Sequence, residues 1–471
     1  AYRTTYELQA NANQGFYYQW ENFANYLFSL GKNTFSVMGG MSYIQNNTFT
    51  VNATGSGPNI LTGYAPNFRY LQYLNNNADT AKSVSGAPGV SANLSYFGRI
   101  HWNYADRYNI QVNFRADAFD SSKLPSDARW GYFPSVSAGW VLTNEPFMKS
   151  IGKEALSFLK IRGSWGVNGN IAVLNNYPYA TTISYNSSYY QYNPGSNVVS
   201  YGSSPSGLAN PNLKWETSEQ YDLGLDARFL SDRLSLGIDY YVKTTKDLLV
   251  SVSPVAEVGV SSSTINAGEV MNRGVELELG WKDSRGDFQY SINANMAYLH
   301  NEVTFLDPTI SRIQGMAPVQ SPDLSTQFEV GYPIWYMRGY QYDGVDTATG
   351  KPILADLDGN GIIDANDQTM VGCGIPDLTY GITINLAWKG IDFTLFGTGT
   401  YGNEIFAVSY RGDRPLYNSL EYFHKNAWTE SNKNASMPSA ISVVSDSKFW
   451  GSSATVFDGS YFKIKQIQLG Y

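Results

Sequence analysis

The sequence predicts an all-β protein: an antiparallel β-barrel that spans a membrane and carries long loops on one side. Apolar and polar residues alternate over residues 220–228, with Tyr221, Leu223 and Leu225 on one face, which is the period of a strand and not of a helix. The opposite face is charged, so it is not a packed core. No run of about 18 apolar residues occurs, which excludes a helical membrane protein.

The same alternation recurs in segments long enough to cross a bilayer. After a turn at 231–233, apolar residues take every second position over 234–243, and residues 288–298 and 380–388 alternate in the same way. Several segments exceed about ten residues, near the length at which a tilted strand crosses a bilayer, whereas a soluble β-sandwich needs shorter strands. We expect the apolar sets to face lipid and the polar sets to face the lumen.

Loop lengths assign the two ends of the strands, because outer-membrane barrels have short periplasmic turns and long outer loops. We expect short turns at 31–33, 105–107, 231–233, 283–285 and 389–390, and a longer periplasmic connection at 144–158 with a helix-like stretch at 147–156. Long outer connections, rich in Ser, Asn, Gly and Tyr, are expected at 45–92, 168–215, 250–270, 301–327, 346–377 and 403–458.

The number of strands depends on one short segment. The strands alternate between the two sides consistently only if residues 328–331 form a strand that turns at 332–333 and returns through 334–345. With this hairpin the count is about 16 strands, against the roughly 22 of plugged outer-membrane transporters.

Composition agrees with a barrel and excludes some partners. Aromatic residues are 15% of the chain, with 36 Tyr and 11 Trp, and charged residues are 15%, against roughly 25% in soluble domains. Interfacial girdles and sugar-stacking surfaces both use such aromatics. The net charge of −8 disfavours nucleic acid. The single cysteine, Cys373, cannot form an internal disulfide and is interpreted as a small loop residue.

Several segments spread over nearly the whole chain carry a family resemblance. Two lead into strands: Asn210-Pro-Asn-Leu-Lys-Trp-Glu-Thr217 and Gly268-Glu-Val-Met-Asn-Arg-Gly-Val-Glu-Leu277. Others are Ser95-Tyr-Phe-Gly-Arg-Ile100, Arg129-Trp-Gly-Tyr-Phe-Pro-Ser-Val-Ser-Ala-Gly-Trp140, Asn144-Glu-Pro-Phe-Met148, Ile161-Arg-Gly-Ser-Trp-Gly166, Leu378-Thr-Tyr-Gly381, Trp388-Lys-Gly-Ile-Asp392 and Gly459-Ser-Tyr-Phe-Lys-Ile464. In this order they resemble the SusC/RagA family of TonB-dependent outer-membrane importers.

The resemblance implies import of oligosaccharides, or in some members peptides, across the outer membrane of a Gram-negative, Bacteroidetes-type bacterium. It implies no enzyme activity, a SusD-like surface lipoprotein that caps the barrel, and a TonB system that displaces a plug. The plug domain and the TonB-binding segment of the family are not recognisable, and the chain begins at Ala1 without a signal peptide. We therefore expect residues 1–471 to be an internal portion of the barrel domain, with the last strands also absent.

Residues 356–367 have the spacing of a twelve-residue calcium loop. The expected ligands, at positions 1, 3, 5, 7, 9 and 12, are Asp356, Asp358, Asn360, the Ile362 carbonyl, Asp364 and Asp367. Gly361 stands at position 6, where the chain must turn sharply, and Asp367 replaces the usual bidentate Glu. Four carboxylates in one turn repel each other unless a cation neutralises them, so we predict a structural Ca²⁺ that staples the loop. The alternative is a solvated acidic turn.

Other candidate chemistry is weaker. Tyr185, Tyr189, Tyr190 and Tyr192 lie in an outer loop among Asn and Ser residues, and are either substrate-binding aromatics that stack on sugar rings or packing residues of the loop. The three histidines, His101, His300 and His424, lack metal-ligand spacing. The sequence predicts no catalytic residue and no organic cofactor.

Two other classes of protein remain open from the sequence. A passive outer-membrane porin has the same alternation but no plug and typically fewer strands. A secreted, calcium-stabilised sugar-binding β-protein would partition into water, whereas a membrane barrel needs detergent.

Overall fold

A computed structural model gives the structure of the chain. It describes residues 6–57, 81–148, 150–152, 154–174, 176–190, 200–205, 207–252, 263–317, 323–407, 420–444 and 446–471. Within these ranges, no helix has both the length and the apolar character needed to cross a membrane. Strands dominate the described residues, as the sequence predicts.

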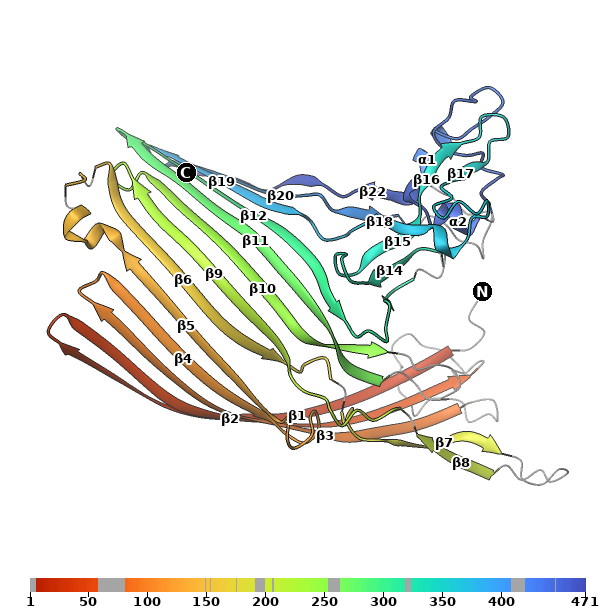
Figure 1. Ribbon diagram of the computed structural model, residues 1–471, viewed down its shortest axis with the longest axis horizontal. Helices are drawn as coiled ribbons and strands as arrows, with labels where there is room; N and C mark the ends of the chain where they lie inside the picture. The colour runs from red at the N-terminus through yellow and green to blue at the C-terminus, as the bar shows by residue number, and fades with distance from the viewer. Residues whose placement is uncertain are drawn as a thin grey trace.

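One antiparallel sheet of 13 strands forms the body of the molecule (Figure 1). Its strands follow one another in the sheet as they do in the chain, apart from segments that leave the sheet between β6 and β9, β12 and β19, and β20 and β23. The strands are β1 (Tyr6–Leu30), β2 (Asn33–Gly57), β3 (Ala81–Tyr104), β4 (Tyr108–Phe119), β5 (Trp130–Val141), β6 (Leu156–Asn170), β9 (Glu216–Phe229), β10 (Leu234–Val252), β11 (Ser263–Arg285), β12 (Phe288–Leu306), β19 (Leu378–Trp388), β20 (Ile391–Tyr401) and β23 (Tyr461–Gly470).

The register of the ladders confirms the two predicted faces. On β10, Ile238 pairs with Leu225 of β9 and with Leu277 of β11, so apolar residues lie beside apolar residues across three strands. On β12, Ile292 pairs with Ile384 of β19. These apolar side chains are exposed to the surroundings, Leu223 to 61% and Ile292 to 39%, because no protein layer covers them. An exposed apolar face of this extent fits lipid.

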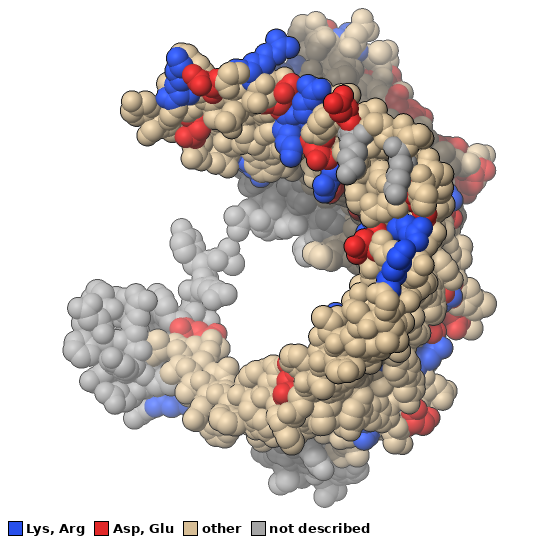
Figure 2. All heavy atoms as spheres, turned by 90° about the vertical axis from the view of Figure 1, so that its left-hand side faces the viewer, with Lys and Arg blue, Asp and Glu red and all other residues tan. Residues whose placement is uncertain are grey.

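The sheet is open. Viewed from the left-hand side of Figure 1, it curls into an arc (Figure 2). Among the described residues no ladder joins β1 to β23, which are the two edges. Short turns lie at the left-hand end of Figure 1 and the long connections lie at the right-hand end, as predicted from loop length.

Two details of the short connections differ from the prediction. The turn between β11 and β12 lies at Gly286 and Asp287, because β11 continues through Arg285 and Gly286 takes a positive φ of 60°. The connection after β5 contains two 3₁₀ turns, η2 (Leu142–Asn144) and η3 (Pro146–Met148), rather than a helix over 147–156. Pro146 begins η3, and because proline has no N–H to donate, it fits the first position of a new helical turn better than the interior of a continuous helix.

The predicted count of about 16 wall strands is wrong. The segment 328–345 does not cross the wall: β12 pairs directly with β19, and the long connection between them folds outside the sheet. β14 (Ser325–Phe328) and β15 (Tyr336–Tyr340) belong instead to a four-stranded sheet with β13 (Ile313–Gln314) and β18 (Gln368–Gly372). Short apolar strands with buried residues on both faces, such as β15, resemble wall strands in sequence but pack into a small core.

The outer connections assemble into a folded cap at the right-hand end of Figure 1. We use the term cap for residues 307–377 and 402–460, within the described ranges. Besides the four-stranded sheet it contains β16 (Tyr342–Val345), β17 (Pro352–Leu354), η5 (Ala365–Asp367), β21 (Glu404–Phe406), α1 (Glu421–Lys425), α2 (Ser447–Trp450), η6 (Ser453–Thr455) and β22 (Val456–Asp458). The isolated bridge between Tyr340 and Ser452 joins the two connections, and the β21–β22 ladder pairs the two ends of the second connection.

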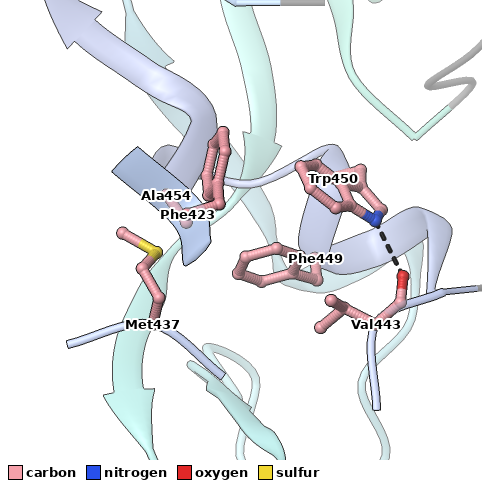
Figure 3. Close-up of a cluster of buried hydrophobic side chains, with 6 residues drawn as sticks. All are labelled: Phe423, Met437, Val443, Phe449, Trp450 and Ala454. Atoms are coloured by element: carbon pink, nitrogen blue, oxygen red, sulfur yellow. Dashed lines mark hydrogen bonds between the residues drawn. The ribbon is translucent and has the colours of Figure 1, made fainter. Parts of the chain in front are cut away.

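A buried apolar cluster holds the second connection of the cap (Figure 3). Its centre is Phe449, 1% exposed, which packs edge to face against Trp450 at 5.1 Å. The indole N–H of Trp450 donates to the carbonyl of Val443 at 2.7 Å. Tyr342, from the first connection, meets the Phe449 ring at 5.6 Å, so the cluster fastens two loops that are distant in sequence.

Candidate functional site

The lumen face of the wall carries an arginine shared by three aspartates. Arg162 on β6 donates to Asp226 at 3.1 Å, to Asp222 at 3.5 Å and to Asp239 at 2.6 Å. The Asp239 side chain is 17% exposed and the Arg162 side chain 34%, so the cluster is partly shielded from solvent. One cation faces three carboxylates, which leaves the cluster acidic.

A glycine makes this cluster possible. In the ladders, Gly224 of β9 lies between Arg162 of β6 and Asp239 of β10. A Cβ at Gly224 would lie 2.3 Å from the Asp239 carboxylate and 2.6 Å from the guanidinium carbon. The absence of a side chain therefore lets Arg162 reach across a whole strand.

The acidic character continues along the wall. Beside the cluster, the next strand carries Glu276 opposite Asp239 and Glu278 opposite Gly237. A groove of about 650 Å³ runs along the wall here, lined in part by the carboxylates of Asp226 and Glu278 and by the cations Lys160 and Arg228. This part of the lumen face can bind polar groups by hydrogen bonding.

Two aromatic belts mark the lipid face. Toward the short turns, Tyr108 stacks between Tyr104 and Trp140 at 6.2 and 6.3 Å. Toward the long loops, Trp130 stacks on Tyr96 at 6.1 Å. Trp130 and Trp140 are ten residues apart on β5, about 33 Å of strand and roughly 25 Å of depth at a tilt near 40°. This depth matches the apolar band of an outer-membrane barrel.

The belt at the short turns is fixed by a buried carboxylate. Glu145, 4% exposed, accepts from Arg107 at 2.8 Å and from the indole N–H of Trp140 at 3.1 Å. A hydrogen bond from Tyr108, with those from Trp140 and Arg107, holds the pKa of Glu145 below its usual value. The segment Asn144-Glu-Pro-Phe-Met148 therefore anchors the turn at the membrane surface.

The structure places the predicted calcium ligands in one loop of the cap but does not bring all six together. Carboxylate oxygens of Asp356, Asp358 and Asp367 lie within 4.8 Å of one another. Asp364 instead caps η5, with its carboxylate accepting from the Asn366 N–H at 2.8 Å. The remaining two predicted ligands contact each other, because the Asn360 side-chain oxygen accepts from the Ile362 N–H at 2.7 Å.

Backbone N–H groups preform the loop. The Asp356 carboxylate accepts from Gly359 at 2.8 Å and from Gly361 at 2.8 Å. Asp367 is fully buried and accepts from Leu357 and from Asp364, each at 2.7 Å. These bonds hold the pKa of Asp367 below its usual value. Three converging carboxylates are a donor set that fits a hard cation such as Ca²⁺.

The other predicted residues are not brought into one site. Tyr185, Tyr189 and Tyr190 lie on β7 (Ile183–Tyr190), which pairs with β8 (Ser200–Pro205) in a separate hairpin, and Tyr192 lies outside the described residues. Cys373 lies just after β18 in an irregular segment of the cap and is buried, and burial raises the pKa of its thiol.

Sequence reasoning missed the arginine cluster. Arg162 lies in the segment Ile161-Arg-Gly-Ser-Trp-Gly166, and Asp222, Asp226 and Asp239 stand on the polar faces of two strands whose alternation is visible. The available signal was a pair of cations on β6, Lys160 and Arg162, beside a strand with Asp at positions four residues apart. Its use required the register of three strands, which the sequence does not give.

A wall with one apolar, aromatic-belted face and one polar face defines a membrane-spanning β-barrel protein. Residues 1–429 match the family described as "TonB dependent receptor-like, beta-barrel". The chain belongs to this family, and its members are transporters and receptors, not enzymes.

Similar proteins support this placement. The chain is 31% identical to TonB-dependent receptor P3 of Formosa agariphila, over 96% of this chain and 45% of that relative. It is 30% identical to TonB-dependent receptor SusC of Bacteroides thetaiotaomicron, over 80% of this chain and 37% of SusC. In fold it is similar to a chain of a structure titled "Structure of the RagAB peptide transporter", with a TM-score of 0.81 and 24% identity, over 98% of this chain and 50% of that one. The chain spans less than half the length of these curated relatives.

Proposed function

We propose that the full-length protein is a SusC-like TonB-dependent importer in the outer membrane of a Bacteroidetes-type bacterium. Its solute is an oligosaccharide or, as the alternative, a peptide. The observation that carries the proposal is a wall with one lipid face and one polar lumen face, in a chain that is 30% identical to SusC over 80% of its length. The groove along the lumen wall supplies carboxylates and amides that bind polar solutes. No bond of the solute is made or broken.

The proposal includes closure of the barrel by other parts of the same polypeptide. Thirteen strands leave two open edges, and each unsatisfied backbone group of an edge costs several kcal/mol in lipid. Barrels of about 22 strands hold a plug, so about nine more strands and a plug complete the importer. The length of the curated relatives leaves room for these parts.

The proposed partners are the TonB system at the short-turn side and a SusD-like surface lipoprotein at the cap side. The folded cap supports the second partner, because a buried core keeps its surface in one shape. The names of the similar proteins, SusC and RagAB, support the same assignment.

The test is energised uptake in the native bacterium. Cells that lack this protein should lose uptake of one class of solute, and cells with the protein but without TonB should lose it to the same extent. A protonophore should abolish uptake in the complete strain. Uptake that persists without TonB would instead identify a passive porin.

We propose also that the loop 356–367 binds a structural Ca²⁺. Asp356, Asp358 and Asp367 supply the converging oxygens, and the ion would neutralise their charge. The Lys448 ammonium donates to the Ile363 carbonyl, so the loop is tied to α2 of the other cap connection. A bound ion would therefore stiffen the contact between the two connections.

A further inference from the structure

The apolar run on the lipid face of β11 ends at an arginine. Every second residue from Val275 to Trp281 is apolar, and Arg273 occupies the next position toward the long connections. The ladders on both sides of β11 run without a register shift from Arg273 to Trp281, so the two side chains share the lipid face. Arg273 is therefore a cation on the surface that meets lipid.

This arginine lies at the outer edge of the apolar band. Trp281 pairs with Leu234, the first residue of β10, and so stands near the short turns. Arg273 is eight residues away from it, about 26 Å of strand and roughly 20 Å of depth at a tilt near 40°. Since the apolar band is about 25 Å tall and the stem of arginine is long and flexible, the guanidinium reaches the headgroups of the outer leaflet.

The neighbouring strands change character at the same rows. The row of Arg273 runs through Tyr221, Val242 and His300, and the next row toward the short turns runs through Leu223, Tyr240, Val275 and Tyr298. Beyond them, toward the long connections, the lipid side carries Glu219, Lys246 and Glu302. Rings with hydroxyls followed by ionised groups are typical of the boundary between hydrocarbon and headgroups.

Glu219, Lys246 and Glu302 have partners at this boundary, whereas Arg273 has none among the described residues. The Lys246 ammonium donates to the Glu219 carboxylate at 3.0 Å. The His300 ring lies 3.2 Å from the Glu302 carboxylate. The Arg273 side chain is exposed, and within the described part of the chain it makes no hydrogen bond and no ion pair. The boundary therefore presents a free guanidinium to an anionic group.

Two tyrosine hydroxyls flank this guanidinium. Tyr240 of β10 and Tyr298 of β12 both pair with Val275, which is the neighbour of Arg273 on the same face. Both are thus diagonal neighbours of Arg273, about 7–8 Å away between Cα atoms, a distance that long side chains bridge. Tyr240 is 47% exposed and Tyr298 48%, and neither hydroxyl has a hydrogen-bond partner among the described residues. A guanidinium and two hydroxyls are donors that match the oxygens of a phosphate.

We propose that Arg273, Tyr240 and Tyr298 bind the phosphate of a lipid in the outer leaflet. The planar guanidinium holds two phosphate oxygens, and the tyrosine hydroxyls donate to the others. The acyl chains of the same lipid lie along Val275 and Leu279, which are 38% and 44% exposed on the lipid face. An imported solute passes on the opposite face of the sheet, so this inference is separate from the importer function.

Native mass spectrometry of the full-length protein in a neutral detergent tests the site, because it counts bound lipids and gives their Kd. The probes are lipid A that carries one phosphate and the same lipid after a phosphatase has removed that phosphate. We expect the phosphorylated lipid to bind about tenfold more tightly, because only it accepts charge-assisted hydrogen bonds from the guanidinium. Arg273→Gln should abolish this preference, and Tyr240→Phe with Tyr298→Phe should reduce it.

The matched control is Arg285→Gln, at the other end of the same face of β11, where Asp283 stands beside the arginine. It should leave the preference for the phosphorylated lipid unchanged, and heat-modifiable migration on gels should show that all variants assemble. An equal preference in the wild type and in Arg273→Gln would overturn the inference. Displacement of the lipid by an equal concentration of inorganic phosphate would also overturn it, because the site would then belong to a free anion.

Discussion

The guanidinium of Arg162 lies 2.6 Å from the carboxylate of Asp239, two strands away in the sheet. Gly224 occupies the position between them, and the approach exists because that residue has no Cβ. Asp222 and Asp226 complete the cluster, so one cation compensates three acids on the lumen face.

Arg162→Leu should destabilise the barrel by about 2 kcal/mol, because it removes charge-assisted hydrogen bonds and leaves three carboxylates to repel one another. Urea unfolding of the full-length protein in lipid vesicles measures the change. Arg233→Leu is the control: its pair with Asp283 spans 3.4 Å at an exposed turn and should contribute less than about 1 kcal/mol.

Gly224→Ala tests whether the contact between Arg162 and Asp239 depends on the missing Cβ at position 224. The new methyl would displace Asp239 or Arg162, so it should destabilise in the same direction as Arg162→Leu. In the double variant the two effects should not add, since both break one contact. Additive losses would show that Gly224 and Arg162 act separately.

An arginine introduced on β12 should destabilise the barrel far more on the lipid face than on the lumen face. Ile292→Arg puts a charge on the lipid face near the strand centre and should cost about 2–4 kcal/mol. Asn293→Arg, the adjacent position on the lumen face, should cost less than about 1 kcal/mol. Folding yield into lipid vesicles measures both, and equal yields would contradict the assignment of the two faces.

Calcium should order the cap without holding the barrel. Asp356→Ala with Asp358→Ala should abolish Ca²⁺ binding and increase hydrogen exchange over 346–377, while the strands of the wall stay protected. Asp364→Asn is the control, because its side chain caps η5 and still accepts from Asn366 after the change. Exchange that is unchanged by a chelator in the native protein would contradict the calcium proposal.

Acid should loosen the same loop in the absence of the ion. The Asp367 carboxylate accepts backbone N–H groups from Asp364, Leu357 and Asp358, and its pKa is lowered. The ionised Asp367 carboxylate therefore stabilises the folded loop above the pKa of about 4 that Asp has in an unfolded chain. This stabilisation is lost as the pH falls through the lower pKa of the folded state. Exchange over 356–367 measured in chelator should rise below about pH 4. In Asp367→Asn, exchange should already be high at neutral pH and show no such rise.

The buried cluster of the cap should unfold locally when its centre is removed. Phe449→Ala leaves a cavity where the ring packs on Trp450 and Tyr342, and should cost about 3–5 kcal/mol of the cap's stability. Limited proteolysis should then cut within 420–457 while the wall resists. Ile441→Ala, at a side chain 88% exposed, should leave the cap intact.

Alternation was enough to predict the two faces of the wall strands, and loop length was enough to predict which end of the strands carries the long connections. Ile238, Ile292 and their neighbours face outward as expected, because a side-chain period of two is fixed by the backbone whatever the strand pairs with. The spacing of 356–367 was likewise local, and three of its carboxylates converge because Gly359 and Gly361 allow the tight turn at positive φ.

Only the tertiary structure decided which segments join the wall and which side chains meet across it. The segment 328–345 alternates like a wall strand, yet it packs into the cap, because its apolar residues find the buried partners of β13 and β18 there. Arg162 meets Asp239 through the register of three ladders. That register is set by long-range pairing, so residues 77 apart in sequence become hydrogen-bond partners that no local pattern specifies.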